Sequence, residues 1–385
     1  MGRVRSRQAL GAVLALLMAT GWAANHFSAL IPVYSSREHL SATLLDGVFG
    51  LYAVGLLPGL FLGGALSDRL GRPRVVLPGA TLAALGTVAL LLDHGSAGLL
   101  VGRLVVGLGA GLAFGAGTAW AADLGGATGT VLAGVLLTAG FGVGPLVSGV
   151  LAQWLPAPLT TPFVVSLLLS VLAVAAAALV AVPATDHAGG RTPPPAQPYQ
   201  SAARTLGWSG PVGLLVFGSA TLAIVPLPAR LPAHYDGPFL VGVACLLTLG
   251  AGIAAQALAR RLRTGPRTGV VGALSSAAGF GLAAAGGTAV GLPLFVACCL
   301  LLGTAYGLCL REGLLDVETL APPARRGLLT GVYYVITYVG FGLPLLLVAI
   351  EPAFGEVAPL VVLAGLGLAM ALVRAVQLTR GHPAR

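Results

Sequence analysis

The chain has 385 residues, of which 57% are hydrophobic and only 9% are charged. Because an average soluble domain carries about 25% charged residues, this composition excludes a soluble enzyme or binding module and indicates a membrane protein. The formal net charge of +9 suggests nucleic acid as a partner. However, the basic residues are spread over alternate loops and do not form one surface, which excludes nucleic-acid binding.

A helix that spans a bilayer needs about 20 mostly apolar residues, and twelve runs in the sequence meet this requirement. In chain order they cover residues 8–34, 44–66, 75–93, 97–122, 127–153, 159–182, 208–230, 237–259, 269–289, 291–318, 327–350 and 357–378. They predict an all-α membrane protein with twelve transmembrane helices. The first run follows basic residues, as in a signal peptide, but its length predicts an uncleaved span.

The charges around these runs predict the orientation of the chain. All 21 basic residues are arginine, and most lie before the first run or after runs 2, 6, 8, 10 and 12. The opposite loops contain only Arg37 and Arg230, together with five acidic residues. The positive-inside rule then places both termini in the cytoplasm. We therefore expect a multi-pass protein of the cytoplasmic membrane, with the lipid bilayer as its surroundings.

A polar stretch at 183–207, which contains Gly189-Gly190 and three consecutive prolines, is typical of a flexible linker. It divides the chain into residues 1–182 and 208–385, with six predicted spans in each part. Short patterns recur between these parts at offsets of 194 to 196 residues. The matches are Ile31-Pro32 with Val225-Pro226, Gly71 with Gly265, and Gly107-x-x-x-Gly111 with Gly303-x-x-x-Gly307. They predict two pseudo-symmetric six-helix bundles, an arrangement typical of secondary transporters.

Three sequence patterns resemble motifs of the major facilitator superfamily, and the resemblance extends over the whole chain. The charged stretch after the second run fits the G-x-L-x-D-R-x-G-R motif of that family through Gly64, Asp68, Arg69, Gly71, Arg72 and Arg74. Arg103, followed by glycines, resembles the motif of the fourth span. The fifth run resembles the antiporter motif through Gly140, Gly144, Pro145 and Gly149, with Ser148 in place of one glycine.

The resemblance implies a twelve-helix transporter that works by alternating access as a monomer, with no cofactor. It also implies a cytoplasmic gate, in which Asp68 caps the helix that begins near Gly327 and Arg72 pairs with Asp123. The antiporter motif is typical of exporters, so we expect proton-coupled efflux of small apolar organic compounds such as drugs or natural products. The proton gradient would supply the energy.

The tenth run carries the candidates for proton coupling. Glu312 and Asp316 are four residues apart and therefore share one helix face. Arg311, beside them, is a candidate for lining the substrate cavity. Carboxylates held away from water inside a membrane are suited to proton transfer. The alternative is that the helix ends near Leu310 and that these charges form its solvated end.

Other polar and aromatic residues are candidates for lining the substrate cavity. Arg103 lies inside the fourth run, where it either faces the cavity or extends to the membrane surface. Asn25 and His26 lie in the first run and either line the cavity or form hydrogen bonds between helices. Tyr334 and Tyr338, in the eleventh run, either pack within the protein or flank an apolar substrate.

The sequence contains no catalytic motif, nucleotide-binding loop or metal-ligand spacing, so we expect neither an enzyme nor a metal site. Two other functions stay open at this point. One is uptake or facilitated diffusion of a sugar or other metabolite, which would favour a more polar cavity. The other is a membrane receptor or sensor that binds a ligand without transporting it.

Overall fold

The computed structural model describes residues 2–180, 200–235, 237–322 and 325–381. Within these ranges the chain forms helices and no strands. The α-helices are α1 (Gly2–Asn25), α2 (Ile31–Arg37), α3 (Ala42–Leu70), α4 (Pro73–Leu92), α5 (Ser96–Trp154), α6 (Thr161–Val180), α7 (Ala202–Ile224), α8 (Pro238–Leu262), α9 (Thr268–Ala285), α10 (Leu292–Leu320), α11 (Arg326–Tyr338), α12 (Leu343–Phe354) and α13 (Ala358–Thr379). Short 3₁₀ helices are η1 (His26–Leu30), η2 (Pro228–Arg230), η3 (Ala233–Tyr235), η4 (Gly265–Arg267) and η6 (Val339–Gly342).

In these ranges, eleven helices are long and apolar enough to cross a membrane. One of them, α5, has 59 residues and contains the two runs predicted at 97–122 and 127–153. It reverses at Gly126, whose φ of 58° is favourable for glycine. As a result, Phe114 and Phe141 meet with ring centroids 5.7 Å apart, although 27 residues separate them. The α5 helix is therefore a hairpin with two antiparallel arms.

Two of the predicted spans are interrupted where their helical geometry changes. The run at 8–34 divides into α1, η1 and α2, and the run at 327–350 divides into α11, η6 and α12. A proline follows each 3₁₀ segment, Pro32 within α2 and Pro344 within α12, at a helix start where proline is tolerated. Each interruption contacts a helix of the other half of the chain, since η1 lies against α8 and η6 lies against α3.

Glycines allow two equivalent pairs of helices to pack closely. A Cβ atom on Gly107 would collide with the carbonyl oxygen of Tyr52, so α5 and α3 approach almost to backbone contact. The same relation recurs in α10 and α8, where a Cβ atom on Gly303 would collide with the Thr248 carbonyl oxygen. Both members of the second pair lie 196 residues after their counterparts. The spacing of the sequence repeat is thus also the spacing of a repeated packing contact.

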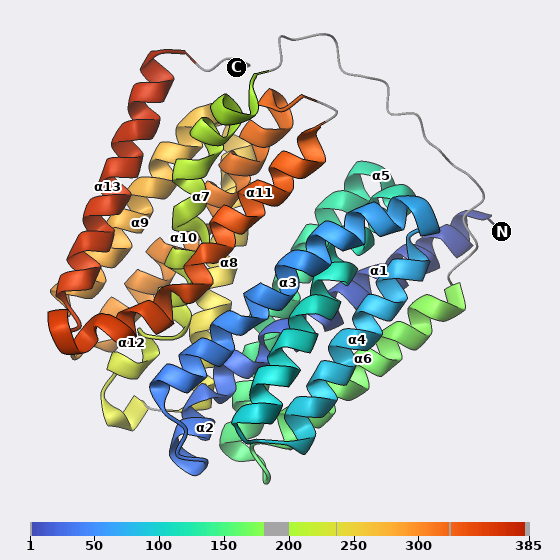
Figure 1. Ribbon diagram of the computed structural model, residues 1–385, viewed down its shortest axis with the longest axis horizontal. Helices are drawn as coiled ribbons and strands as arrows, with labels where there is room; N and C mark the ends of the chain where they lie inside the picture. Colours follow the sequence, from blue (N-terminus) through green and yellow to red (C-terminus); the bar gives the residue numbers. More distant parts are fainter. Residues whose placement is uncertain (1, 181–199, 236, 323–324, 382–385) are drawn as a thin grey trace.

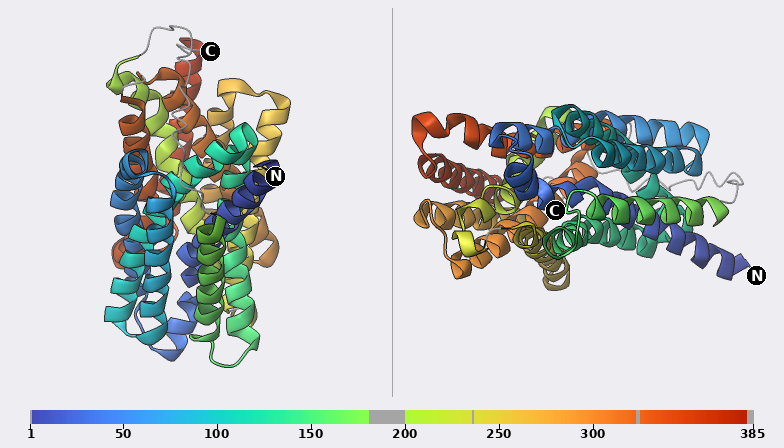
Figure 2. Two further views of the ribbon diagram at one scale, coloured as in Figure 1. Left: turned by 90° about the vertical axis from the view of Figure 1, so that its right-hand side faces the viewer. Right: turned by 90° about the horizontal axis from the view of Figure 1, so that it is seen from below.

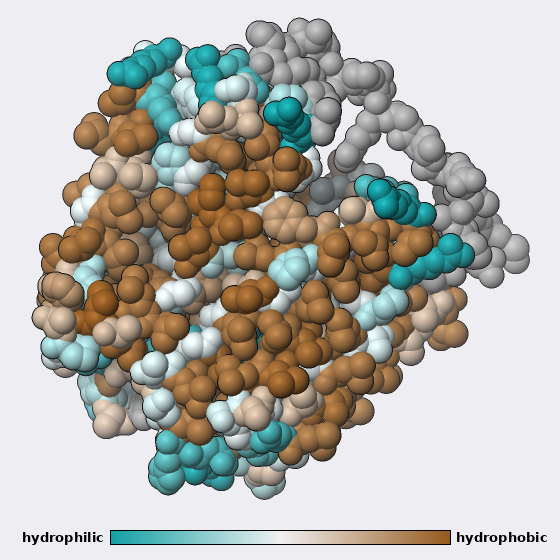
Figure 3. All heavy atoms as spheres, viewed as in Figure 1, coloured by the Kyte–Doolittle hydropathy of each residue, from teal (hydrophilic) through white to brown (hydrophobic). Residues whose placement is uncertain are grey.

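The helices form two groups that lie side by side, α1–α6 and α7–α13 (Figures 1 and 2). We call the end of the molecule with Arg69 and Arg260 the basic end, and the end with Glu38 and Glu351 the acidic end. The groups meet toward the acidic end, and their axes diverge toward the basic end (Figure 1). Figure 3 shows hydrophobic residues in a broad band between hydrophilic residues at the two ends, as expected of a protein within a bilayer.

Two predicted boundaries differ from the structure. Most of the linker predicted at 183–207 lies outside the described residues, but α7 already begins at Ala202, where Ser201 Oγ accepts a hydrogen bond from Arg204 N at 3.2 Å. This N-terminal cap extends the helix beyond the apolar run that defined its predicted start at 208. The charged turn is also shorter than predicted, because α3 continues to Leu70 and α4 starts at Pro73.

Replacing Gly107 with alanine should lower the stability of the protein by about 1–3 kcal/mol, because the new methyl group has no space beside α3. Gly303→Ala should have a similar effect through the equivalent contact with α8. Gly134→Ala is the matched control, since Gly134 is an exposed helical glycine with nothing within 4 Å of its Cβ position. Thermal unfolding of the purified proteins in detergent measures the difference. Equal melting temperatures for all three variants would contradict close helix packing.

Candidate functional site

An aromatic cluster joins the two groups of helices. It consists of Phe49 and Tyr52 from α3, Phe217 from α7, Tyr338 from α11 and Phe341 from η6. Phe341 stacks on Phe49 at 5.3 Å and on Tyr338 at 5.3 Å, and its ring lies 4.8 Å from that of Phe217. Offset and tilted aromatic pairs at these separations are favourable. One ring, that of Phe341, therefore contacts aromatic side chains of both groups.

Two more tyrosines extend this cluster within the α7–α13 group. Tyr306 from α10 lies 5.6 Å from Phe217, and Tyr334 lies 6.3 Å from Tyr338. Tyr338 is 9% exposed, while Tyr334 is only partly buried. The structure thus brings the two predicted cavity tyrosines to the meeting point of the groups.

Arg103 lies next to the aromatic cluster and is completely buried. Its Nη1 donates a hydrogen bond to the carbonyl oxygen of Ala24 at 2.6 Å, at the point where α1 gives way to η1. The guanidinium group also lies over the ring of Tyr52 at 4.7 Å and over that of Phe27 at 5.1 Å. These cation–π contacts and the carbonyl hold a positive charge inside the α1–α6 group. Arg103 therefore does not extend to the membrane surface.

Asn25 connects the two groups, whereas His26 does not. Asn25 Nδ2 donates to the carbonyl oxygen of Phe141 at 2.8 Å and lies 3.9 Å from Cys245 Sγ of α8. His26, the first residue of η1, is completely buried against α6, with its Nδ1 3.0 Å from Ser166 Oγ. His26 thus makes the hydrogen bond between helices that the sequence left open as an alternative to a cavity position.

The glycines of the fifth-span motif provide close contacts on two sides. Cβ atoms on Gly140 and Gly144 would collide with α1, at the Met18 carbonyl oxygen and at Trp22 respectively. A Cβ atom on Gly149 would instead collide with the Pro238 carbonyl oxygen at the start of α8. The second arm of α5, which also contains Pro145, is therefore packed between its own group and the other one.

The charged residues of α10 belong to a buried cluster that α13 completes. Glu312 and Asp316 are both 0% exposed, and a single atom, Arg374 Nη2, lies 2.9 Å from Glu312 Oε1 and 2.8 Å from Asp316 Oδ2. Arg374 also donates from Nη1 to the Trp208 carbonyl oxygen at 3.2 Å and lies over the Trp208 ring at 4.9 Å. Because α10 continues to Leu320, the alternative of a solvated helix end at these residues is wrong.

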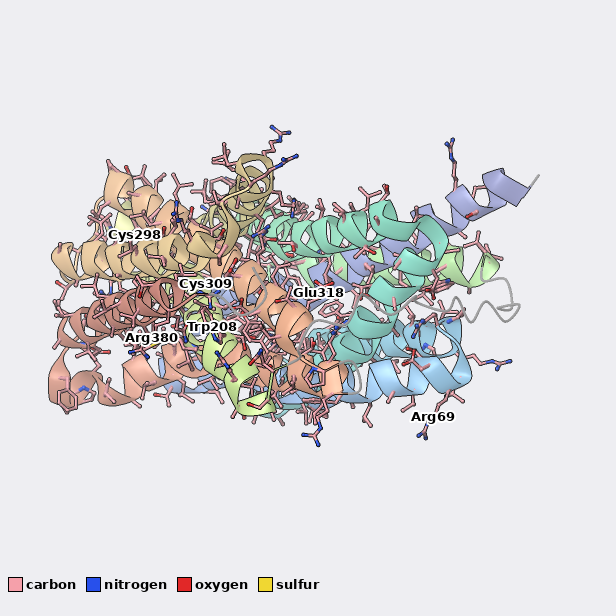
Figure 4. The ribbon with its side chains drawn as sticks, turned by 90° about the horizontal axis from the view of Figure 1, so that it is seen from above. Arg69, Trp208, Cys298, Cys309, Glu318 and Arg380 are labelled. Carbon is pink, nitrogen blue, oxygen red and sulfur yellow. The ribbon has the colours of Figure 1, made fainter. Side chains whose placement is uncertain are left out.

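The carboxylates of this cluster have two arginine neighbours, Arg311 and Arg374. Arg311 is 20% exposed, and its Nη1 lies 3.8 Å from Glu312 Oε2. Arg374, near the end of the twelfth predicted run, is one of the arginines on which the predicted orientation was based, but in the structure it is buried as the counter-ion of two carboxylates. Viewed from the basic end, Trp208 and Cys309 lie together inside the α7–α13 group (Figure 4). The charged cluster of Glu312, Asp316 and Arg374 thus lies within the α7–α13 group. It is separate from the aromatic cluster, which contacts α3.

The residues of the predicted gate form a network at the basic end of the α1–α6 group. Arg72 Nη1 lies 2.5 Å from Asp68 Oδ1, and Arg72 Nε lies 3.2 Å from Asp123 Oδ2. Asp68 is 69% exposed, and Arg69 points away from the molecule (Figure 4). The pairing of Arg72 with Asp123 is thus present in the structure, and Asp68 is held by Arg72. Of the remaining motif residues, Gly71 forms the turn with a φ of 91°, Gly64 has open space at its Cβ position, and Arg74 bonds the Leu70 carbonyl oxygen.

A cavity at the acidic end was not predicted from the sequence. It has a volume of about 600 Å³ and is lined by both groups of helices. Asp46, the one acidic residue of the run 44–66, lines it and is 6% exposed. Arg230 lies on the opposite side, where burial lowers the pKa of its guanidinium and the nearby Glu356 and Glu351 oppose this shift. An isolated acid in an apolar run is a signal that could have revealed this site.

The comparison with known families decides the family of the chain. The model of the Major Facilitator Superfamily matches residues 10–345. The chain belongs to this superfamily. Its family and its structural neighbours are membrane transporters and not enzymes, which confirms the resemblance predicted from the sequence motifs.

Known proteins match the chain in two different ways, by sequence over a short segment and by fold over nearly the whole chain. Multidrug resistance protein MdtL of Escherichia coli O45:K1 is 33% identical over 84 residues, which is 22% of this chain and 22% of MdtL. A solved POT family transporter in complex with 5-aminolevulinic acid has a TM-score of 0.76 at 13% identity, and 96% of each chain is covered. The peptide transporter POT in complex with sulfate has a TM-score of 0.77 at 15% identity, with 97% of this chain and 94% of that chain covered. At this level of identity, the two structures establish the fold alone.

Replacing Arg374 with glutamine should destabilise this transporter by about 3–5 kcal/mol, because it leaves two carboxylates buried without their counter-ion. Adding Glu312→Gln and Asp316→Asn to the same protein should restore much of the loss. Arg380→Gln is the matched control, since Arg380 is exposed just after α13. Thermal unfolding in detergent checks these values. A single variant as stable as the control would contradict the structural role of Arg374.

Proposed function

We propose that the protein exports small apolar organic compounds across the cytoplasmic membrane by alternating access, in exchange for protons. The aromatic cluster around Phe341 carries this proposal. It lies where the two groups of helices meet, and its rings offer an apolar surface that both groups share. Ligand sites of this kind are mostly apolar with a few placed polar groups, a role that suits Arg103 and Asn25.

We propose that the two groups are the moving units, residues 1–182 and 208–385, with 183–207 as the linker between them. The two arms of α5 then count as separate spans, which gives twelve spans and places both termini on one side. By the positive-inside rule the basic end is cytoplasmic. The groups contact one another at the acidic end through Gly149 and Pro238, and through Gln153 Oε1, which accepts from Phe239 N at 3.1 Å. A substrate would therefore enter from the cytoplasm in this conformation.

Efflux is supported by two observations. The Gly140, Gly144, Pro145 and Gly149 pattern resembles the motif of exporters, and its glycines lie against both α1 and α8. In addition, the multidrug resistance protein MdtL matches the chain over a segment of 84 residues. Both point to an exporter of apolar compounds, and neither identifies the compound.

Proton coupling would use the buried cluster of Glu312, Asp316 and Arg374. Two carboxylates share one nitrogen atom of Arg374, and Arg311 is a second, partly exposed cation beside them. If Arg311 moves into solvent during the cycle, two negative charges face one positive charge, and one carboxylate then favours binding a proton. Coupling therefore depends on α10 and α13 remaining in contact while Arg311 changes its position.

Transport in proteoliposomes with a lumenal pH dye tests this function. A lipophilic compound added under an imposed pH gradient should trigger proton movement in the wild-type protein. Phe341→Ala should reduce the rate by about 10-fold or more, because it removes the ring that contacts both groups, while Phe354→Ala, at a residue 66% exposed, should not.

Glu312→Gln should abolish proton movement and preserve exchange of the compound. Equal loss of both activities in Glu312→Gln would contradict proton coupling, and binding without transport would favour a receptor.

A second prediction concerns the proposed cytoplasmic gate formed by Asp68, Arg72 and Asp123. Asp68→Asn should slow transport several-fold, because we propose that Asp68 leaves Arg72 to cap α11 near Gly327 when the basic end closes. Glu38→Gln, an exposed acid at the opposite end, should leave the rate unchanged. Initial rates at equal protein density in the liposomes make the comparison. An unchanged rate for Asp68→Asn would refute the gating role.

A further inference from the structure

Tyr333 of α11 is a fully buried tyrosine that does not belong to the aromatic cluster. It is 0% exposed, and its hydroxyl donates a hydrogen bond to the Cys309 carbonyl oxygen of α10 at 3.1 Å. A Cβ atom on Gly313 of α10 would collide with both the ring and the hydroxyl of Tyr333. The Tyr333 side chain therefore lies directly on the backbone of α10, over the turn from Cys309 to Gly313.

The face of α10 that Tyr333 contacts also carries the two buried carboxylates. Cys309, Glu312, Gly313 and Asp316 follow the spacing i, i+3, i+4 and i+7, which places them on one side of a helix. Glu312 and Asp316 are the two acids that share Arg374 Nη2, at 2.9 Å and 2.8 Å. A movement of Tyr333 relative to α10 therefore acts on the turn that holds the proposed proton carriers.

Tyr333 also contacts α7, which holds the counter-ion of these acids. A Cβ atom on Gly213 of α7 would collide with the Tyr333 ring. On the same helix, the Trp208 carbonyl oxygen accepts a hydrogen bond from Arg374 Nη1 at 3.2 Å. Tyr333 is thus wedged between two helices, of which α10 holds the carboxylates and α7 holds a partner of Arg374.

The opposite face of α11 contacts the other group of helices. A Cβ atom on Gly331 would collide with the ring of Phe61 in α3. Two residues correspond to about 200° around a helix, so Gly331 and Tyr333 lie on opposite faces. Figure 1 shows α11 between α7 and the α1–α6 group, and α11 contacts both α7 and α3. Just beyond Tyr333, the stacked rings of Tyr338 and Phe341 belong to the aromatic cluster.

Exchange of an uncharged compound for protons requires a physical link between two sites. Such a compound has no net charge with which to displace a proton from a carboxylate, so its binding must act through packed contacts that can adopt two arrangements. An aromatic ring wedged between two helix backbones meets this requirement, because protein interiors are close-packed and transmit strain. The α11 helix therefore connects the aromatic cluster with the charged cluster of Glu312, Asp316 and Arg374.

We propose that Tyr333 is a positioning residue that couples compound binding at the aromatic cluster to proton release from the Glu312 and Asp316 pair. The inference rests on the proposed exchange of compounds for protons and identifies the contact that links the two. A compound that packs against Phe341 and Tyr338 displaces α11. Tyr333 passes this displacement to the turn of α10 at Gly313, and one carboxylate then transfers its proton to water.

Proton release on compound binding tests this link without any need for transport. Chloramphenicol and benzophenone, two uncharged aromatic compounds, are added to the purified full-length protein in weakly buffered detergent with a pH dye, and equilibrium binding is measured in parallel. Tyr333→Phe should bind each probe within about 2-fold of the wild-type Kd. The number of protons released per bound probe should fall by about 5-fold, as expected from loss of one hydrogen bond.

Two further variants define the role of the contact. Tyr34→Phe is the matched control, since Tyr34 is also 0% exposed but lies in the α1–α6 group, and it should leave binding and proton release unchanged. Gly313→Ala places a methyl group where the Tyr333 ring lies. It should lower proton release per bound probe while binding persists, although the Tyr333 hydroxyl is intact.

A wild-type number of protons per bound probe in Tyr333→Phe would overturn the proposal. Equal loss of binding and proton release would also overturn it, because that result indicates a structural role. If the wild-type protein binds neither probe, or binds them without releasing protons, the inference fails together with the proposed site or the proposed coupling. If Tyr333→Phe lowers proton release as expected while wild-type proteoliposomes move no compound, export fails and the link through Tyr333 stands.

Discussion

The close approach of helices at glycine residues is the contact on which the rest of the structure depends. Gly107 and Gly111 place one arm of α5 against the backbone of α3, and Gly303 and Gly307 place α10 against α8 in the same way. In lipid, helices gain little from burying apolar side chains, so small residues that allow close packing provide much of the association energy. Helices within each group are therefore closely packed, and we propose that motion takes place between the groups.

The same environment makes buried charge costly, and most of the buried charges among the described residues have a partner within their own group. Arg103 is held by a carbonyl oxygen and two aromatic rings inside the α1–α6 group. Arg374 neutralises Glu312 and Asp316 inside the α7–α13 group. Asp46 differs because it faces a cavity between the groups, where a ligand can approach it. The buried charges within a group thus have protein partners, whereas Asp46 lines a cavity between the groups.

The sequence predicted the family, the long apolar helices and the repeat, because these depend on composition and spacing. It also predicted the pairing of Arg72 with Asp123, through a motif of high specificity. It did not predict the counter-ion of Glu312, because Arg374 is 62 residues away and is brought near only when α13 packs beside α10. Asp46 was overlooked for a related reason, since its burial between groups depends on residues such as Arg230 and Glu351 that are distant in the chain. The breaks at η1 and η6 were not predicted, because each lies inside a run that is apolar enough overall to be one continuous span, although Asn25, His26 and Ser28 lie at η1 and a proline follows each break.

We propose that the two groups of helices move as rigid units relative to each other about their contact at the acidic end. Distances between spin labels on the protein in lipid test it directly, since the four native cysteines are buried and labels can be placed on introduced ones. One pair, at Arg69 and Leu328, spans the two groups at the basic end, and a second pair, at Arg69 and Thr130, lies within the first group. This motion predicts two distance populations for the first pair, which shift when a transported compound or the pH changes, and one unchanged distance for the second pair. A single, unchanging distance across the groups would contradict it.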